Sequence, residues 1–212
     1  MAHSYPLMLD VTARLIVIIG GGKVAARKCE GLLASGATKI RVVSPAFCDS
    51  LPAGVERVTA TYEPSKLKGA GLVFAATNVP AVNDAVVRDA QSIGVLVNRA
   101  DGSDELPGDF STPAMHRQEA VTFTVSAGGS PVLAARIRDQ IAPLLDRDLV
   151  MMADAMREIR PVVLADQSLT EPQRREIFRS LASDEAIDIL KRGGLNSLLE
   201  WIALQSQIKN RK

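Results

Sequence analysis

Three small residues, Gly20, Gly22 and Ala25, have the spacing of a turn that holds a phosphate group. The first glycine permits a tight turn, the second lets a pyrophosphate approach the backbone, and the alanine keeps a following helix close to the preceding strand. The N-terminus of that helix supplies free N–H groups and the positive end of its dipole. The spacing predicts a dinucleotide-binding turn, and a glycine-rich turn that binds nothing is the alternative.

The sequence on either side of the glycines is that of a strand followed by a helix. Residues 15–19 form an unbroken apolar and mostly β-branched run, typical of a parallel strand buried on both faces. Residues 23–33 then carry apolar side chains at helical spacing. In this context four residues are candidates for contact with a dinucleotide: Gly20, Gly22, Lys23 and Val24.

Strands alternate with helices over the first half of the chain. We expect strands at residues 40–43, 58–62, 71–76 and 93–97 and a helix at 80–92, and residues 5–9 could add an edge strand. This alternation predicts an α/β fold with a Rossmann-like, mostly parallel sheet.

Polar residues follow two of these strands, at the edge where open α/β sheets bind ligands. Ser44 and Pro45 end the second strand, where many dinucleotide folds carry an acidic residue for the adenine ribose. Ser44 could bond the ribose or tolerate a 2′-phosphate, so NADP stays open beside NAD. Thr77 and Asn78 end the next buried strand. All four are further candidates for cofactor binding.

The pattern changes after residue 109. We expect strands at 110–115 and 120–125 joined by a turn at 116–119, then helices at 131–145, 147–160, 171–182, 184–191 and 195–208, the last two separated by Gly193-Gly194. The expected domains are an NAD-binding Rossmann domain (1–112), a small β–helix segment for dimerisation and substrate contact (113–146), and an all-helical C-terminal domain (147–212).

Charge and composition argue against several classes of protein. The net charge is +1, from 25 basic and 24 acidic residues, which gives no general case for binding nucleic acid or a membrane surface. No apolar stretch approaches the roughly 18 residues of a membrane span, and the N-terminus lacks a signal-like core. Cys29 and Cys48 have no metal-ligand spacing. We expect a cytoplasmic protein without a metal site of its own.

Five segments occur in a characteristic order: IIGGGKVAARK at 18–28, AATN at 75–78, VNRAD at 97–101, DFSTPA at 109–114 and SAGGSPVLAARIR at 126–138. Together they resemble the precorrin-2 dehydrogenase/sirohydrochlorin ferrochelatase family, the N-terminal module of siroheme synthase. The resemblance implies NAD-dependent oxidation of the tetrapyrrole precorrin-2 to sirohydrochlorin in a homodimer. Some members of that family also insert ferrous iron, so iron is a further candidate substrate.

The same resemblance makes Asp101 the key catalytic carboxylate. A general base is chemically reasonable, because oxidation of a reduced tetrapyrrole releases a proton as well as a hydride. A cap on an Asp-Gly turn is the alternative, and the acidic loop that follows leaves Asp104 as another choice of carboxylate. Asn98 could position Asp101 or the nicotinamide, or only satisfy backbone groups at the end of its strand.

A second glycine turn precedes the helix expected at residues 131–145. A helix N-terminus of this kind can bind a carboxylate, and precorrin-2 carries acetate and propionate side chains. A capped helix start at a subunit interface is the alternative. The candidates for substrate binding here are Ser126, Gly128, Gly129 and Ser130.

Two other functions remain open from the sequence. A non-catalytic NAD-sensing Rossmann module would bind NAD without turnover. A dehydrogenase of another small substrate would have a compact pocket and would tolerate Asp101→Asn.

Overall fold

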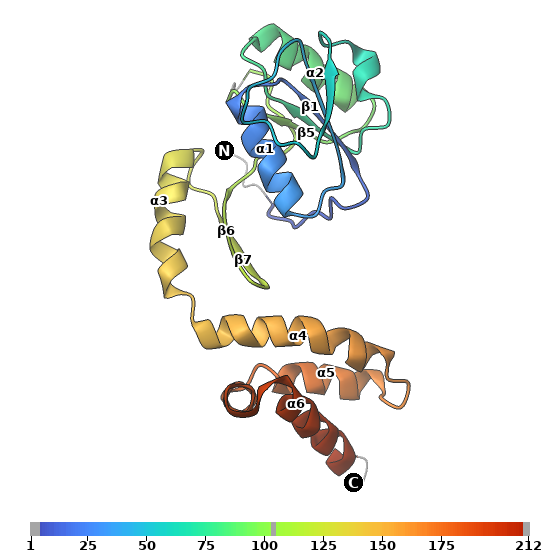
Figure 1. The fold of residues 1–212 in the computed structure, drawn as a ribbon, viewed down its shortest axis with the longest axis vertical. Helices are drawn as coiled ribbons and strands as arrows, with labels where there is room; N and C mark the ends of the chain where they lie inside the picture. Colours follow the sequence, from blue (N-terminus) through green and yellow to red (C-terminus); the bar gives the residue numbers. More distant parts are fainter. Residues whose placement is uncertain (1–4, 103–104, 210–212) are drawn as a thin grey trace. The chain divides into compact units, whose positions relative to one another are not determined.

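The chain divides into two compact units, residues 1–112 and 113–212, coloured blue to green and green to red in Figure 1. The computed structural model describes residues 5–102 and 105–209. Each unit has its own hydrophobic core.

Unit 1 is a five-stranded parallel sheet in the order β3-β2-β1-β4-β5. This confirms the predicted Rossmann-like α/β fold, in which the strand order reverses beside the first strand. Its elements are β1 (Leu15–Ile19), α1 (Lys23–Ala34), β2 (Lys39–Ser44), β3 (Glu56–Thr59), the short helix η1 (Pro64–Leu67), β4 (Leu72–Ala75), α2 (Pro80–Ser92) and β5 (Val97–Arg99).

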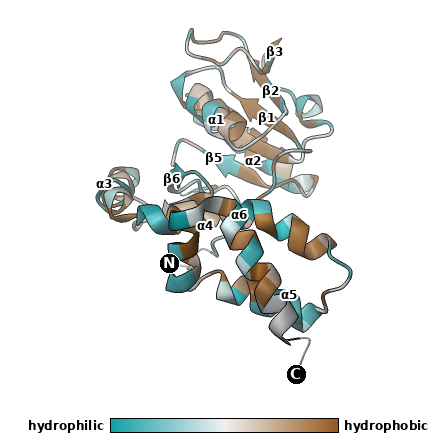
Figure 2. Ribbon diagram, turned by 60° about the horizontal axis from the view of Figure 1, so that its bottom comes forward, coloured by the Kyte–Doolittle hydropathy of each residue, from teal (hydrophilic) through white to brown (hydrophobic). Residues whose placement is uncertain are grey.

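The two faces of this sheet have separate cores. Successive side chains of a strand point to opposite faces, so Ile16 and Ile18 of β1 pack with Ala25 and Cys29 of α1. Val17 and Ile19 lie in the core that α2 helps to form. The alternation explains why β1 and β4 are apolar throughout, and Figure 2 shows β1 in brown.

Unit 2 begins with an antiparallel hairpin and continues as helices. Its strands β6 (Ala114–Gln118) and β7 (Val121–Val125) precede α3 (Pro131–Ile141), the short helix η2 (Ala142–Leu144), α4 (Arg147–Ala165), α5 (Glu171–Ser180) and α6 (Asp184–Lys209). Buried residues of α4 recur at helical spacing and pack with α5 and α6, among them Ile159, Ile177 and Leu198. Unit 2 therefore holds both the expected β–helix segment and the expected helical domain, whose separation stays a prediction.

Several expected strands are displaced or absent. Residues 5–9 form no strand. The strand expected at 93–97 is β5, at Val97–Arg99, because α2 ends in a turn at Gly94 (φ 70°) in which Val95 N donates to Ala90 O. The strand expected at 58–62 begins and ends earlier, as β3.

The hairpin also starts later than expected, because residues 110–112 are held to unit 1. The carbonyl of Phe110 accepts a hydrogen bond from Asn98 Nδ2 at 2.8 Å, and Lys28 Nζ donates to Thr112 Oγ1. Residues 116–118, expected in a turn, therefore belong to β6, and the turn is at 119–120.

Three helix ends differ from expectation. Helix α3 stops at Ile141 rather than near 145, before the Pro143-containing η2. Helix α4 continues beyond residue 160, through Pro161 to Ala165, with Val163 buried in the core. Residues 184–209 form one element, although Gly194 has non-helical angles (φ 69°, ψ −167°), which places the break at the predicted glycine pair.

Candidate functional site

The glycine turn lies where β1 meets its two neighbouring strands. Ile19 pairs with Val43 of β2 and with Ala75 of β4. Gly20 N donates to Val43 O at 2.9 Å, and Ala76 N donates to Ile19 O at 2.8 Å. The predicted cofactor residues that follow β1, β2 and β4 are thus brought to one edge of the sheet, at the point where ligands bind in open α/β folds.

The structure requires glycine at two of the three positions of the turn but not at the third. Gly20 has φ 121°, and a Cβ there would lie 2.3 Å from Ala76 O; a Cβ on Gly21 would lie 2.1 Å from Ala46 O. Both glycines are therefore required by the protein's own backbone. A Cβ on Gly22 would meet nothing within 4 Å among the described residues. Packing alone does not require glycine at 22, which fits a site where a ligand approaches the backbone.

The start of α1 also fits an anionic ligand. Gly22 is the N-cap, and in this fully described segment no side chain caps the helix and no acidic residue lies in its first turn. The first N–H groups of the helix therefore keep their capacity to bind phosphate oxygens. Lys23 and Val24 are exposed in this turn. The residues present fit a dinucleotide pyrophosphate.

The ends of β2 and β4 complete this edge. Ser44 is 8% exposed, and its Oγ would lie 2.9 Å from a Cβ on Gly21. Pro45 and Asn78 are exposed, whereas Thr77 is half-buried. Thr77 Oγ1 donates to the side-chain oxygen of Asn83 at 2.8 Å, so this predicted cofactor residue is also part of a polar network.

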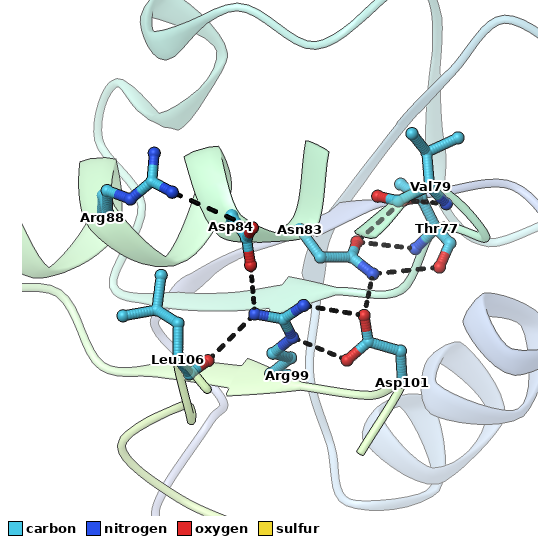
Figure 3. Close-up of polar contacts among 8 residues, drawn as sticks. All are labelled: Thr77, Val79, Asn83, Asp84, Arg88, Arg99, Asp101 and Leu106. Atoms are coloured by element: carbon cyan, nitrogen blue, oxygen red, sulfur yellow. Dashed lines mark hydrogen bonds and ion pairs between the residues drawn. The ribbon is translucent and has the colours of Figure 1, made fainter. Parts of the chain in front are cut away.

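That network holds Asp101, as Figure 3 shows. Arg99 Nε contacts Asp101 Oδ1 at 2.6 Å, Arg99 Nη2 contacts Oδ2 at 3.1 Å, and Asn83 Nδ2 donates to Oδ2 at 2.7 Å. The side chain of Asp101 is 22% exposed and that of Arg99 is 3% exposed. A carboxylate with a bidentate arginine and an amide donor is held in one orientation and in its charged form.

Arg99 is shared between two carboxylates. Its Nη1 contacts Asp84 Oδ1 at 2.5 Å and donates to Leu106 O at 3.0 Å. Arg88 Nη2 lies 3.8 Å from Asp84 Oδ2 at the surface. Hydrogen bonding to Asp101 first, and then to Asp84, raises the pKa of Arg99 despite its burial. Arg99 therefore stays charged.

Asn83 and Asp84 were not among the residues predicted for the site. Asn83 is fully buried and lies on the stripe of α2 that includes Val86, Val87 and Ala90. The sequence signal that could have identified Asn83 is a polar residue within the apolar stripe of a helix. Such a residue predicts a hydrogen-bonded partner, because a buried amide is costly unless it is hydrogen-bonded. Val79, the N-cap of the same helix, is 46% exposed.

Asn98 is not brought to Asp101. Neighbouring residues of a strand face opposite ways, so Asn98 turns from Arg99 and its Nδ2 bonds the carbonyl of Phe110. Its Oδ1 is buried and has no hydrogen-bond partner among the described residues. Asp109 anchors the same stretch, with Oδ2 accepting from Val97 N at 2.9 Å. Asp104, the alternative carboxylate, lies outside the described residues.

In unit 2, the second glycine turn precedes α3 as predicted. Gly128 and Gly129 have φ 54° and 79°, and a Cβ on either would meet nothing within 4 Å among the described residues. Ser126 and Ser130 are exposed. Ser130 Oγ accepts from Leu133 N at 3.3 Å, which makes Ser130 the N-cap of α3.

The described ranges, 5–102 and 105–209, lack two kinds of feature. They hold no group of three or more His, Cys, Asp or Glu residues placed to bind a metal ion. They also contain no helix with the length and apolarity that a membrane crossing needs.

Comparisons with known proteins agree with this geometry. A family model described as putative NAD(P)-binding matches residues 7–114, about half of the chain. A siroheme synthase of Photorhabdus laumondii is 35% identical over 179 residues, which cover 82% of this chain and 37% of the relative. Siroheme synthase 2 of Aeromonas hydrophila is 30% identical and covers 93% of this chain and 42% of the relative. The chain thus spans about two-fifths of these relatives.

A solved structure of SirC, a precorrin-2 dehydrogenase, has the same fold over nearly the whole chain. Its TM-score is 0.74, and the match covers 94% of this chain and 99% of SirC. The sequence identity is 23%, so this likeness concerns the fold.

Proposed function

We propose that this chain, which belongs to the family of putative NAD(P)-binding domains, oxidises precorrin-2 to sirohydrochlorin with NAD. The observation that carries the proposal is one sheet edge that combines an open glycine turn at α1 with a carboxylate held by Arg99 and Asn83. The siroheme synthases among the relatives and the fold of a precorrin-2 dehydrogenase support the choice of substrate.

The edge of the sheet supplies the cofactor site of this proposal. NAD, when bound, accepts the hydride that precorrin-2 loses. Gly20 and Gly22 leave the backbone accessible to the pyrophosphate, and the N–H groups of Lys23 and Val24 lie in the first turn of α1 to bind its oxygens. Beyond them, Ser44 and Pro45 would hold the adenine ribose, and Thr77 and Asn78 would hold the nicotinamide half.

Asp101 acts on the macrocycle. Oxidation leaves positive charge on the tetrapyrrole, and a fixed carboxylate stabilises that charge most where water is excluded. Asp101 then accepts the proton that the oxidised macrocycle releases. Because its side chain is partly exposed, the proton passes on to solvent. The chemistry balances as one hydride and one proton lost from the substrate.

The glycine turn of unit 2 is the proposed site for substrate carboxylates. The open space at Gly128 and Gly129 and the N-terminus of α3 support this assignment. Because Ser130 Oγ caps the helix and Ser130 N donates to Ala127 O at 2.8 Å, the hydroxyl of Ser126 and the backbone at Gly128 and Gly129 are the groups assigned to the substrate. The proposed role of Asn98 is indirect, since its side chain holds the connector at Phe110.

The homodimer is also part of the proposal. Helix α3 and the short helix after it expose apolar side chains, with Val132 82% and Leu144 78% exposed. An open hollow of about 630 Å³ runs along the same helix. Exposed apolar side chains on neighbouring helices are typical of an association surface, and the partner that we infer is a second copy of the chain.

An anaerobic absorbance time course with purified protein, precorrin-2 and NAD tests the proposal. We expect conversion to the spectrum of sirohydrochlorin, and about 10²-fold or greater loss of kcat in Asp101→Asn. Asp89→Asn is the matched control, because Asp89 lies on α2 and accepts a hydrogen bond from Tyr62 at 2.8 Å, away from Asp101. Binding of NADH without any turnover would instead support an NAD-sensing module.

Ferrous iron insertion is tested in the same cuvette. Iron added after the first phase should change the spectrum faster than in a protein-free control if the chain also inserts the metal. Iron insertion, the choice of NAD over NADP and a cytoplasmic location all stay predictions from the sequence.

A further inference from the structure

The carboxamide of Asn83 can lie in only one orientation. Its Oδ1 accepts from Thr77 N at 3.1 Å, and its Nδ2 donates to Thr77 O at 3.1 Å. A backbone N–H only donates and a backbone carbonyl only accepts, so these two bonds fix which end of the amide is nitrogen. The group that faces Asp101 Oδ2 at 2.7 Å is therefore a hydrogen-bond donor.

The bond to Asp101 is distinct from the other bonds of this amide. The contacts with Thr77 close the turn between β4 and α2. The remaining proton of Nδ2 reaches a carboxylate 18 residues further along the chain. Asn83 thereby joins the end of β4, where the proposed cofactor site lies, to the carboxylate that follows β5.

The charges around Asp101 make the hydrogen bond from Asn83 important for the charge of this carboxylate. Arg99 of β5 is the facing cation, and it is divided between Asp101 and Asp84 of α2. Arg88, also on α2, lies against Asp84 rather than Asp101. One guanidinium serves two carboxylates, and the donor from Asn83 adds to the interactions that favour the charged form of Asp101.

We propose that Asn83 is a positioning residue, which fixes Asp101 relative to the end of β4 and keeps its carboxylate charged by donating to Oδ2. Its part in catalysis rests on the proposed oxidation of precorrin-2. Its effect on the charge of Asp101 does not.

Asn83→Asp tests this role with little change in shape. The new carboxyl group would lie against Asp101, and two carboxylates in contact share a proton because both cannot be charged at once. We expect the midpoint pH at which Asp101 takes up its proton to rise by at least about one pH unit. NMR of ¹³C-labelled aspartate carboxyls follows this titration. The acid limb of the pH profile of kcat should move with it, and kcat at pH 7 should fall about tenfold or more.

Gln91→Glu is the matched control. Gln91 lies on the same helix, and its Nε2 donates to Asp109 Oδ1 at 2.9 Å, also across 18 residues. The same amide-to-carboxylate change there should leave the titration of Asp101 and the pH profile as in the wild type. Asn83→Ser, which removes the donor to Asp101 without adding charge, serves if Asn83→Asp does not fold. It should move the titration upward by a smaller amount.

The outcomes separate the two proposals. An unmoved titration of Asp101 in a folded Asn83 variant would overturn the role of Asn83, whatever the activity. If the titration of Asp101 shifts in the variant but the wild-type protein does not oxidise precorrin-2, the control of charge is supported and the proposed function is overturned. A shifted titration with an unchanged pH profile would show that Asn83 does not act in catalysis through Asp101.

Discussion

Gly20 and Gly22 differ in what requires them, although both belong to the same motif. Alanine at 20 would place a Cβ 2.3 Å from Ala76 O at φ 121°, so we expect Gly20→Ala to lower the free energy of unfolding by about 2 kcal/mol or more. Alanine at 22 would enter open space at φ −86°, at a cost of about 1 kcal/mol or less. Urea unfolding of both variants measures this difference.

Gly22→Ala should affect the binding of NADH more than it affects stability. If a pyrophosphate approaches the backbone there, a methyl group in that space should raise the Kd for NADH about tenfold or more, as a fluorescence titration would measure. A Gly22→Ala protein that is stable and binds NADH as tightly as the wild type would remove the main support for the phosphate site.

Lys28 is a residue whose charge should make stability depend on pH. Burial lowers the pKa of Lys28 to about 8, and its Nζ lies 5.5 Å from the centre of the Phe74 ring. The folded protein therefore binds fewer protons at this site than the unfolded chain between about pH 8 and the ordinary value of 10.5. In this window, stability must rise with pH.

We expect Lys28→Met to be more stable than the wild type near pH 7 and to lose this advantage as the pH rises. The change should be on the order of 1 kcal/mol, because the side chain is only partly buried. Urea unfolding at pH 7.5 and pH 9.5 measures it, with Lys39→Met, at an exposed position of β2, as the control. A difference that stays constant with pH would mean that Lys28 is hydrated as an exposed lysine is.

At the scale of elements, Gly194 interrupts α6 in a conformation that other residues rarely adopt. Its angles, φ 69° and ψ −167°, fall in a region populated almost only by glycine. Gly194→Ala should cost about 1–3 kcal/mol although the space is open. The measurement is thermal unfolding, with the Kd for NADH as a control that should not change. Unaltered stability would mean that the two halves of α6 can join as a continuous helix.

The sequence predicted elements best where local pattern and tertiary structure agree. β1 and α1 were predicted closely because a continuous apolar run, a glycine turn and a helical pattern all apply to the same residues. The predicted start of β6 was wrong because contacts from Asn98 and Lys28 hold residues 110–112 as a connector. Such contacts join residues distant in the chain, and no local pattern encodes them.

The candidate site follows the same rule. The glycines and the polar ends of the strands could be predicted, because strand order alone brings them to one edge. Asn83 could not be paired with Asp101, since the bond depends on how α2 turns against β5. Of the roles considered for Asn98, its side chain takes the one of bonding a backbone carbonyl, that of Phe110, because Asn98 and Arg99 lie on opposite faces of β5.

At the scale of the whole molecule, the apolar surface of α3 and η2 leads to a prediction about assembly. The chain spans about two-fifths of the siroheme synthases that it matches, so the association state must be measured on this chain itself. If two copies associate through this surface, charges placed on it should separate them, because a buried lysine without a partner is costly.

Val132→Lys combined with Leu144→Lys changes the two most exposed apolar side chains of this surface. We expect sedimentation equilibrium to give twice the chain mass for the wild type and the single-chain mass for the double variant at equal concentration. Ile93→Lys, which charges a similarly exposed apolar residue of unit 1, should leave the dimer intact. If the double variant keeps the mass of a dimer, the interface lies elsewhere. If the wild type is already a monomer, α3 serves another partner or the substrate.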